Sequence, residues 1–182
     1  MPLAVRIALA LLLALALLWV VVQSRARTQE ARAEAAFPPE GRILEVNGHR
    51  VHALSMGSGP DIVLIHGASG NLRDMTLSLA PRLAKRYRVT LLDRPGLGYT
   101  DRINRSGATI RQQAELLSDA ARQIGVENPI VLGHSYGGAV ALAWAVHRPD
   151  HIAALVPLSS PAKPWAGDLS AYYKLLSHPV LG

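Results

Sequence analysis

Short apolar runs alternate with segments of helical periodicity along most of this chain, and the alternation limits the folds that it can adopt. The runs begin the segments DIVLIHG, RVTLLD, IVLGHS and IAALVPLSS, and each is short enough to be a buried strand. Between them lie patterns with apolar residues at helical spacing, of which TIRQQAELLSDAARQIGV is the clearest. Strands that alternate with helices predict a largely parallel sheet with helices on both faces.

A β-hairpin is predicted ahead of this alternation. Asn47 and Gly48 form a type I′ turn signal between two segments of alternating polarity, residues 43–46 and 49–56. From Asn71 onward, NLRDMTLSLAPRLAKRY has the spacing of a helix. The predicted fold class is therefore α/β. Ligands in such sheets bind at the carboxyl ends of the strands, where the loops HGASGN, DRPGLGYTDR and GHSYGG are expected.

The N-terminus carries an apolar segment, residues 3–22, with Arg6 as its one charge. Twenty helical residues measure about 30 Å, the thickness of the hydrocarbon core of a bilayer. Arg6 can reach the headgroups, and Trp19 lies where indole favours the interface. We expect residues 1–22 to be an uncleaved transmembrane anchor. The alternative is a cleaved signal peptide, although QSRARTQEAR, which follows, lacks a small-x-small cleavage site.

A polar linker is predicted at residues 23–41. RARTQEARAEAA can continue the helix out of the membrane, and FPPEG ends it. Basic residues flank the apolar segment on both sides, so the side of the membrane that holds the remaining chain stays open.

Composition narrows the classes of function. The net charge of +6 is only a mild excess of basic over acidic residues, and no nucleic-acid-binding module is visible. An anionic membrane surface is therefore the more natural partner for the basic residues near the N-terminus. There are no cysteines, which excludes disulfides and thiolate chemistry.

One serine stands in a setting that favours reactivity. Ser135 lies in Gly133-His134-Ser135-Tyr136-Gly137, a G-x-S-x-G motif with an apolar strand before it and a helical pattern after it. A serine on a sharp strand-to-helix turn projects its hydroxyl from the sheet, and side chains two positions before and after would collide with that turn. The following helix directs the positive end of its dipole at developing negative charge. Ser135 is therefore a candidate nucleophile.

Four segments together resemble the α/β-hydrolase superfamily: LIHGASGN, LLDRPGLGYTD, IVLGHSYGGAVALAWAVHRPDHI and ALVPLSSP. The resemblance runs from Ile43 to the C-terminus in the order and spacing of the family. It implies that Ser135 is the nucleophile and that the backbone N–H groups of Ala68 and Tyr136 form the oxyanion hole. Such donors stabilise a tetrahedral oxyanion by about 3–4 kcal/mol each.

The resemblance also implies roles for flanking residues and a reaction class. His66 and Gly67 shape the oxyanion loop, with proton transfer by His66 as the less favoured role, and Asp93 and Arg94 order turns beside the pocket. Relatives that open epoxides or remove halides carry an aspartate nucleophile, so Ser135 favours acyl transfer from an ester or related small molecule to water. No cofactor and no metal are implied. Carbon–carbon bond hydrolysis and cofactor-free peroxidase chemistry remain open within the superfamily.

A serine nucleophile needs a base and an orienting acid. The family places both after later strands, so we expect residues 42–162 to be the N-terminal part of the core and residues 163–182 the start of a lid. The chain is then an N-terminal fragment, truncated after about the sixth strand, with an apolar sheet edge exposed. We expect it to show no esterase turnover alone. The alternative is a non-catalytic, membrane-tethered binding module.

No residue within the chain is a favoured substitute for the missing partners. The residues that we considered are His134, His147, Asp150, His151, Asp168 and His178. His134 is expected to point away from Ser135, and His147 lies about 18 Å along the next helix. His151 is expected at the wrong end of the sheet, Asp150 in a turn, and Asp168 and His178 in or near the lid.

Apolar residues of the predicted lid have two interpretations. They are Trp165, Tyr172, Tyr173, Leu175 and Leu176, at partly helical spacing. Ordinary packing of the lid on the core is the favoured interpretation, and an acyl-binding wall is the alternative.

Overall fold

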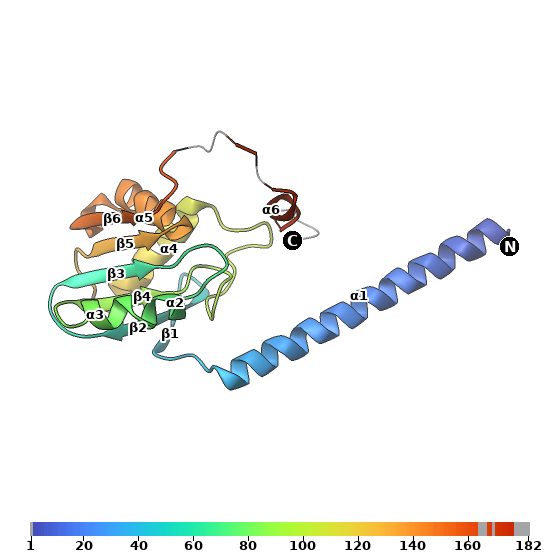
Figure 1. Ribbon diagram of the computed structural model, residues 1–182, viewed down its shortest axis with the longest axis horizontal. Helices are drawn as coiled ribbons and strands as arrows, with labels where there is room; N and C mark the ends of the chain where they lie inside the picture. Colours follow the sequence, from blue (N-terminus) through green and yellow to red (C-terminus); the bar gives the residue numbers. More distant parts are fainter. Residues whose placement is uncertain (1, 164–166, 169, 177–182) are drawn as a thin grey trace. The chain divides into compact units, whose positions relative to one another are not determined.

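The computed structural model describes residues 2–163, 167–168 and 170–176, and it divides into two compact units, Met1–Pro39 and Glu40–Gly182 (Figure 1). The second unit contains a six-stranded sheet in the order β1-β2-β4-β3-β5-β6. Its strands are β1 (Arg42–Val46), β2 (His49–Met56), β3 (Asp61–Ile65), β4 (Arg88–Leu92), β5 (Ile130–His134) and β6 (Ala154–Leu158).

Four of these strands, β4, β3, β5 and β6, run parallel, whereas the β1–β2 hairpin and the β2–β4 pair are antiparallel. The turn of the hairpin is formed by Asn47 and Gly48, both with positive φ, as the type I′ signal predicted. The predicted α/β fold class, with a hairpin ahead of a largely parallel sheet, is therefore confirmed.

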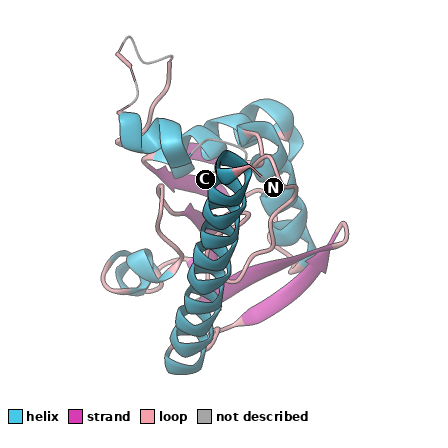
Figure 2. Cartoon of the chain, turned by 90° about the vertical axis from the view of Figure 1, so that its right-hand side faces the viewer, coloured by secondary structure: helices cyan, strands magenta, loops and turns pink. Residues whose placement is uncertain are grey.

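Helices cover both faces of the sheet (Figure 2). They are α2 (Arg73–Thr76) and α3 (Leu79–Leu83) on one face and α4 (Ile110–Gln123) and α5 (Tyr136–His147) on the other. The 3-10 turn η1 (Pro149–His151) follows α5 in the chain, and α6 (Ala171–Leu176) follows β6. Successive strand residues alternate between the two faces. Val63 and Ile65 of β3 pack in one cluster with α4 and α5, while Ile62 and Leu64 pack in the other with α2 and α3.

The segment from Asn71 onward forms two short helices rather than one. The break falls at Ser78, whose φ of −147° is not helical. Pro81 lies in the first turn of α3, where its missing N–H has no intrahelical partner in any case. In a continuous helix its ring would clash with the carbonyl of Leu77, so the chain begins a new helix at Leu79, two residues before the proline.

Helix α4 starts with a capping box, which fixes the loop that leads into it. Thr109 accepts a hydrogen bond from the N–H of Gln112, and the side chain of Gln112 accepts one from the N–H of Thr109. One face of α4 is buried, including Leu116 and Leu117, as its amphipathic pattern predicted.

Strand β6 forms one edge of the sheet. Its apolar residues Val156 and Leu158 are exposed by 40% and 45%. An exposed apolar edge is the feature predicted for a sheet that ends after about the sixth strand.

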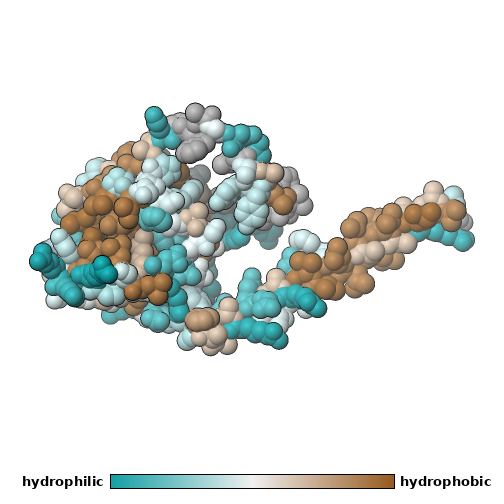
Figure 3. Space-filling view, viewed as in Figure 1, coloured by the Kyte–Doolittle hydropathy of each residue, from teal (hydrophilic) through white to brown (hydrophobic). Residues whose placement is uncertain are grey.

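The first unit is a single helix, α1 (Leu3–Ala36), which ends at Phe37, just before Pro38 and Pro39. Residues 23–36 of the predicted linker are therefore helical. Within the part of the chain that the structure describes, α1 is the one helix long and apolar enough to cross a membrane. Apolar residues cover most of its length in Figure 3, and hydrophilic residues gather toward its C-terminal end.

Candidate active site

Ser135 occupies the sharp turn between β5 and α5, with φ 52° and ψ −121°. A non-glycine residue with this backbone geometry is strained, and such residues concentrate at functional sites. The turn is held by two backbone bonds, from the N–H of Ser135 to the Leu158 carbonyl at 2.9 Å and from the N–H of Gly138 to the Ser135 carbonyl at 2.9 Å. This is the strand–turn–helix geometry that a nucleophilic serine requires.

The glycines around Ser135 allow backbone segments to touch. A Cβ atom added to Gly133 would lie 2.2 Å from the carbonyl oxygen of Gly137. A Cβ atom added to Gly137 would lie 2.3 Å and 2.4 Å from the carbonyl oxygens of His66 and Ile65. The start of α5 therefore packs directly on the end of β3, which places the loop after β3 beside Ser135.

Two backbone donors flank this serine. Tyr136 is the first residue of α5, so its N–H has no acceptor within the helix. Gly67 lies so close to Ser135 that a Cβ atom on Gly67 would be 3.4 Å from the serine Cβ, and Ala68, the next residue, is exposed. Among the described residues, neither the Ala68 nor the Tyr136 N–H has a hydrogen-bond acceptor.

Both ring nitrogens of His66 are hydrogen-bonded within and beside this loop. Its Nδ1 donates to the Gly67 carbonyl oxygen at 2.9 Å, and its Nε2 accepts from the N–H of Arg94 at 2.9 Å. These two bonds require the neutral ring with the proton on Nδ1. Burial lowers the pKa of His66, and the positive charge of Arg94 acts in the same direction. The ring has no nitrogen free for proton transfer.

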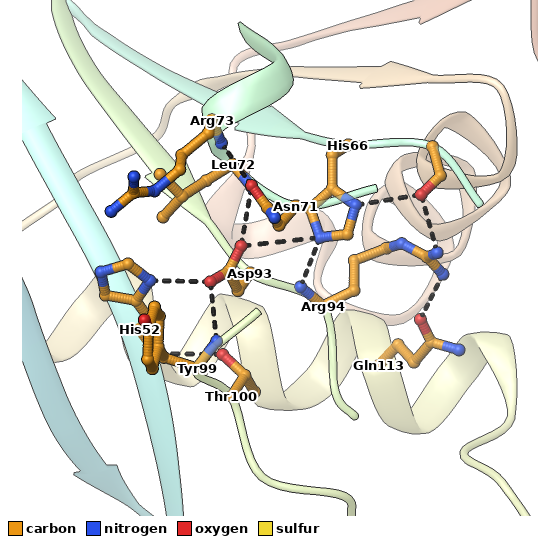
Figure 4. Close-up of polar contacts among 11 residues, drawn as sticks. His52, His66, Asn71, Leu72, Arg73, Asp93, Arg94, Tyr99, Thr100 and Gln113 are labelled. Carbon is orange, nitrogen blue, oxygen red and sulfur yellow. Dashed lines mark hydrogen bonds and ion pairs between the residues drawn. The ribbon is translucent and has the colours of Figure 1, made fainter. Parts of the chain in front are cut away.

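Asp93 joins three separate segments of the chain (Figure 4). Its carboxylate accepts from Nδ1 of His52 at 2.7 Å, from the N–H of Leu72 at 2.7 Å and from the N–H of Tyr99 at 3.0 Å. Burial alone would raise the pKa of Asp93, but these hydrogen bonds outweigh it and hold the pKa below its usual range.

His52 was not singled out from the sequence. Its Nε2 lies 2.6 Å from the carbonyl oxygen of Glu40, so each ring nitrogen faces an acceptor. Burial opposes the charge, but the bonds to Asp93 and Glu40 outweigh it and raise the pKa of His52. His52 and Asp93 thus form a buried ion pair.

Arg94 is buried between the loop after β3 and helices α4 and α5. Its Nη2 donates to the Gly67 carbonyl oxygen at 2.9 Å, and its Nη1 donates to Oε1 of Gln113 at 3.1 Å. The guanidinium carbon lies 4.6 Å from the centre of the Tyr136 ring, a cation–π distance. Burial lowers the pKa of Arg94.

The other histidines of the described residues do not contact the Ser135 hydroxyl. His134 is exposed beside Gly67, and His147 ends α5. His151 lies in η1, ahead of β6, where Ser118 donates to its Nδ1 and its Nε2 donates to the Val126 carbonyl. Within the described residues, no side chain is hydrogen-bonded to the Ser135 hydroxyl.

Asp150 and Asp168 each pair with a cation rather than with a histidine. Asp150 accepts from Arg122 at 2.7 Å, and Asp168 pairs with Lys174 of α6. Tyr172 and Tyr173 of α6 are exposed and meet edge to face. The predictions for Trp165 and His178, and for the side chain of Leu176, lie outside the described residues.

A cavity of about 350 Å³ opens next to the turn, lined in part by His66, Gly67, His134 and Leu158. Ser135 is not among its lining residues, so the candidate site is the group of loops rather than this cavity. Among the described residues, no cluster of three or more His, Asp or Glu side chains is placed to hold a metal ion.

The profile of the family described as "alpha/beta hydrolase fold" matches residues 60–176, more than half of the chain. This chain belongs to the α/β-hydrolase fold family. The match includes the loop after β3, the loop after β4 and the turn at Ser135, so the resemblance drawn from the sequence is confirmed at the level of the family and its fold.

Curated relatives differ in the reactions that their names describe. The chain is 37% identical over 131 residues to the dihydrolipoyllysine-residue acetyltransferase component of the acetoin cleaving system of Cupriavidus necator, covering 71% of this chain and 33% of that protein. It is 32% identical over 111 residues to a 2-hydroxy-6-oxononadienedioate/2-hydroxy-6-oxononatrienedioate hydrolase of Klebsiella pneumoniae, covering 59% of this chain and 38% of that protein. The chain thus spans only a third to two fifths of the length of these relatives.

Among solved structures, this α/β-hydrolase chain is similar to a membrane phospholipase A described as a bacterial virulence factor. The TM-score is 0.64 at 25% identity, over 91% of this chain and 54% of that one. Hydrolases thus recur among the relatives of the chain.

Proposed function

We propose that this protein is a membrane-anchored serine hydrolase that cleaves a carboxylic ester or related acyl bond through an acyl-enzyme on Ser135. The observation that carries the proposal is the strained backbone of Ser135, φ 52° and ψ −121°, at the start of α5. Two backbone N–H groups beside it have no acceptor in the part of the chain that the structure describes. Strain is retained where it positions a reacting group, and free donors beside it are the parts of an oxyanion hole.

In the proposed reaction, Oγ of Ser135 attacks the substrate carbonyl carbon and its proton passes to a general base. The carbonyl oxygen becomes an anion that the N–H groups of Ala68 and Tyr136 stabilise. Collapse of this intermediate expels the alcohol, which takes up a proton, and leaves the acyl group on Ser135. Water then attacks the acyl-enzyme, releasing a carboxylic acid and restoring the hydroxyl.

The similarity to a membrane phospholipase A supports an ester substrate, because phospholipases A cleave carboxylic esters. The similarity to an oxononadienedioate hydrolase supports the alternative of carbon–carbon bond hydrolysis at the same serine.

Membrane anchoring is supported by helix α1. Its apolar residues from Leu3 to Val22 are all exposed, which is the surface expected of a helix that lies in lipid. Arg25, Arg27 and Arg32 follow this surface and can contact anionic headgroups.

A fluorophosphonate probe tests the nucleophile. The wild-type product of the complete reading frame should be labelled, and Ser135→Ala should not be, while Ser106→Ala, in an exposed loop, should be labelled like the wild type. Equal labelling of wild type and Ser135→Ala would refute the assignment and favour the alternative of a non-catalytic, membrane-tethered binding module.

Alkaline carbonate extraction tests the anchor. The wild type should stay with the membrane pellet, and a variant that starts at Gln23 should be released. A reporter fused to the C-terminus should show which side of the membrane holds the site. Release of the wild type by carbonate would contradict an integral anchor.

A further inference from the structure

Arg94 is a buried cation without a carboxylate partner. It is 5% exposed, and no Asp or Glu of the described residues lies within ion-pair distance of it. Its Nε is a buried donor with no acceptor among those residues. Burying an unpaired charge is costly, so the fold retains Arg94 at a cost in stability. A role in stability therefore does not explain this residue.

The hydrogen bonds of Arg94 converge on the peptide unit of the proposed oxyanion hole. Nη2 donates to the Gly67 carbonyl oxygen, which belongs to the same peptide group as the N–H of Ala68. His66 Nδ1 donates to the same oxygen, so this carbonyl accepts two hydrogen bonds. Donors on a carbonyl oxygen withdraw electrons from the amide and make its N–H a stronger donor, since linked hydrogen bonds polarise one another.

Arg94 also contacts the residue that bears the second donor. Its guanidinium carbon lies 4.6 Å from the centre of the Tyr136 ring, which holds the first residue of α5 against the loop after β4. One side chain therefore contacts both segments that supply N–H groups beside Ser135.

We propose that Arg94 is a positioning residue for the oxyanion hole, which strengthens the Ala68 N–H as a donor through the Gly67 carbonyl and places an uncompensated positive charge behind the developing oxyanion. This inference rests on the proposed acyl-transfer function. The transition state carries a negative oxygen and the ground state does not, so Arg94 acts on kcat and hardly on KM.

The test compares Arg94→Gln with Arg94→Lys in the product of the complete reading frame, using hydrolysis of p-nitrophenyl butyrate. Fluorophosphonate titration of Ser135 counts the reactive sites, so that unfolded molecules do not lower the rate per site. Arg94→Gln should lose roughly 10-fold in kcat, less than the loss of a whole oxyanion-hole donor, with KM changed less than about 2-fold. Arg94→Lys, which keeps the charge, should recover most of this loss.

Arg105→Gln is the matched control, because Arg105 is exposed in the loop that also contains Arg94. The kcat and KM of Arg105→Gln should equal those of the wild type. The melting temperature of Arg94→Gln should stay within about 4 °C of the wild type, since the substitution removes an unpaired buried charge. A purely structural role predicts instead a lower melting temperature with unchanged kcat per titrated site.

The outcomes separate this inference from the proposed function. Equal kcat for Arg94→Gln and wild type, or an Arg94→Lys variant as slow as Arg94→Gln, would overturn the role of Arg94 alone. A wild type without turnover that depends on Ser135 would overturn the proposed function, and this inference with it.

Discussion

Nδ1 of His52 lies 2.7 Å from Oδ2 of Asp93, and both side chains are 1% exposed. The pair joins β2 to the loop after β4, and the second nitrogen of His52 extends the link to the Glu40 carbonyl. The Asp93 carboxylate also accepts hydrogen bonds from the backbone N–H groups of Leu72 and Tyr99. Three segments that surround the candidate site therefore depend on one buried ion pair.

The His52–Asp93 pair gives the fold a pH dependence of known sign. Because the pKa of His52 is raised, His52 contributes fully to the free energy of unfolding at a pH below its ordinary pKa near 6.5. This contribution is lost as the pH rises through the raised pKa. Because the pKa of Asp93 is lowered, Asp93 contributes fully to the free energy of unfolding at a pH above its ordinary pKa of 3.8. This contribution is lost as the pH falls through the lowered pKa.

Replacing His52 with Gln tests this pair. At pH 6 the variant should lose about 3 kcal/mol of unfolding free energy, since it leaves the Asp93 carboxylate buried without its cation. The difference from the wild type, measured by urea unfolding in detergent, should shrink as the pH rises above the raised pKa of His52. His49→Gln, in the same strand but only half-buried, is the control. A difference that grows with pH would contradict the charged state assigned to His52.

Replacing Gly137 with Ala should disrupt the turn around Ser135. The new Cβ would lie 2.3 Å from the His66 carbonyl oxygen, which is backbone at the end of β3 and cannot rotate away. We expect a loss of about 3 kcal/mol or more in unfolding free energy, together with loss of fluorophosphonate labelling.

Gly125→Ala separates this clash from backbone strain. Gly125 has φ +74° but nothing within 4 Å of an added Cβ, so its replacement should cost only about 1 kcal/mol and preserve labelling. Similar losses for both variants would show that close packing is not what selects glycine at position 137.

The strain at Ser135 is measurable as stability. The unfolding free energy of Ser135→Gly should be about 1 kcal/mol higher than that of Ser135→Ala. Glycine adopts φ 52° without the steric cost that serine and alanine both bear. Neither variant should be labelled by the probe, so the comparison isolates the backbone. An alanine variant as stable as the glycine variant would mean that the turn is unstrained.

The capping box of α4 should contribute to stability independently of the site. Thr109→Ala removes the acceptor of the Gln112 N–H and should lower the unfolding free energy by about 1 kcal/mol. Ser106→Ala, which loses only a bond to Asn104 on the exposed loop, should change it by less than about 0.5 kcal/mol. Labelling of Ser135 should be unaffected in both variants.

The succession of strands and helices along the chain and the turn at Ser135 could be predicted because local rules govern them. Apolar runs of five residues between helical patterns require a parallel sheet, and Gly133 and Gly137 are required by contacts between backbone atoms that no side chain can replace. The two-helix segment could also have been predicted, since Pro81 excludes a continuous helix through Leu77.

The roles of His52 and Gln113 could not be predicted, because their contacts join segments far apart in the sequence. His52 lies in a strand where a polar residue is ordinarily expected to face solvent, but its ring nitrogens contact Asp93, in the loop after β4, and the Glu40 carbonyl. Gln113 is one polar residue of an amphipathic helix, and its contact with Arg94 depends on how α4 packs on the sheet.

The hydrogen bonds of the buried histidines have a consequence for chemical modification. His52, His66 and His151 each have both ring nitrogens engaged and are 4% exposed or less, whereas His49, His134 and His147 reach the surface. Diethyl pyrocarbonate acts on an accessible, unprotonated imidazole nitrogen. Among these six histidines, carbethoxylation should therefore mark only the surface three in the native protein, and modification of the buried three would report opening of the fold.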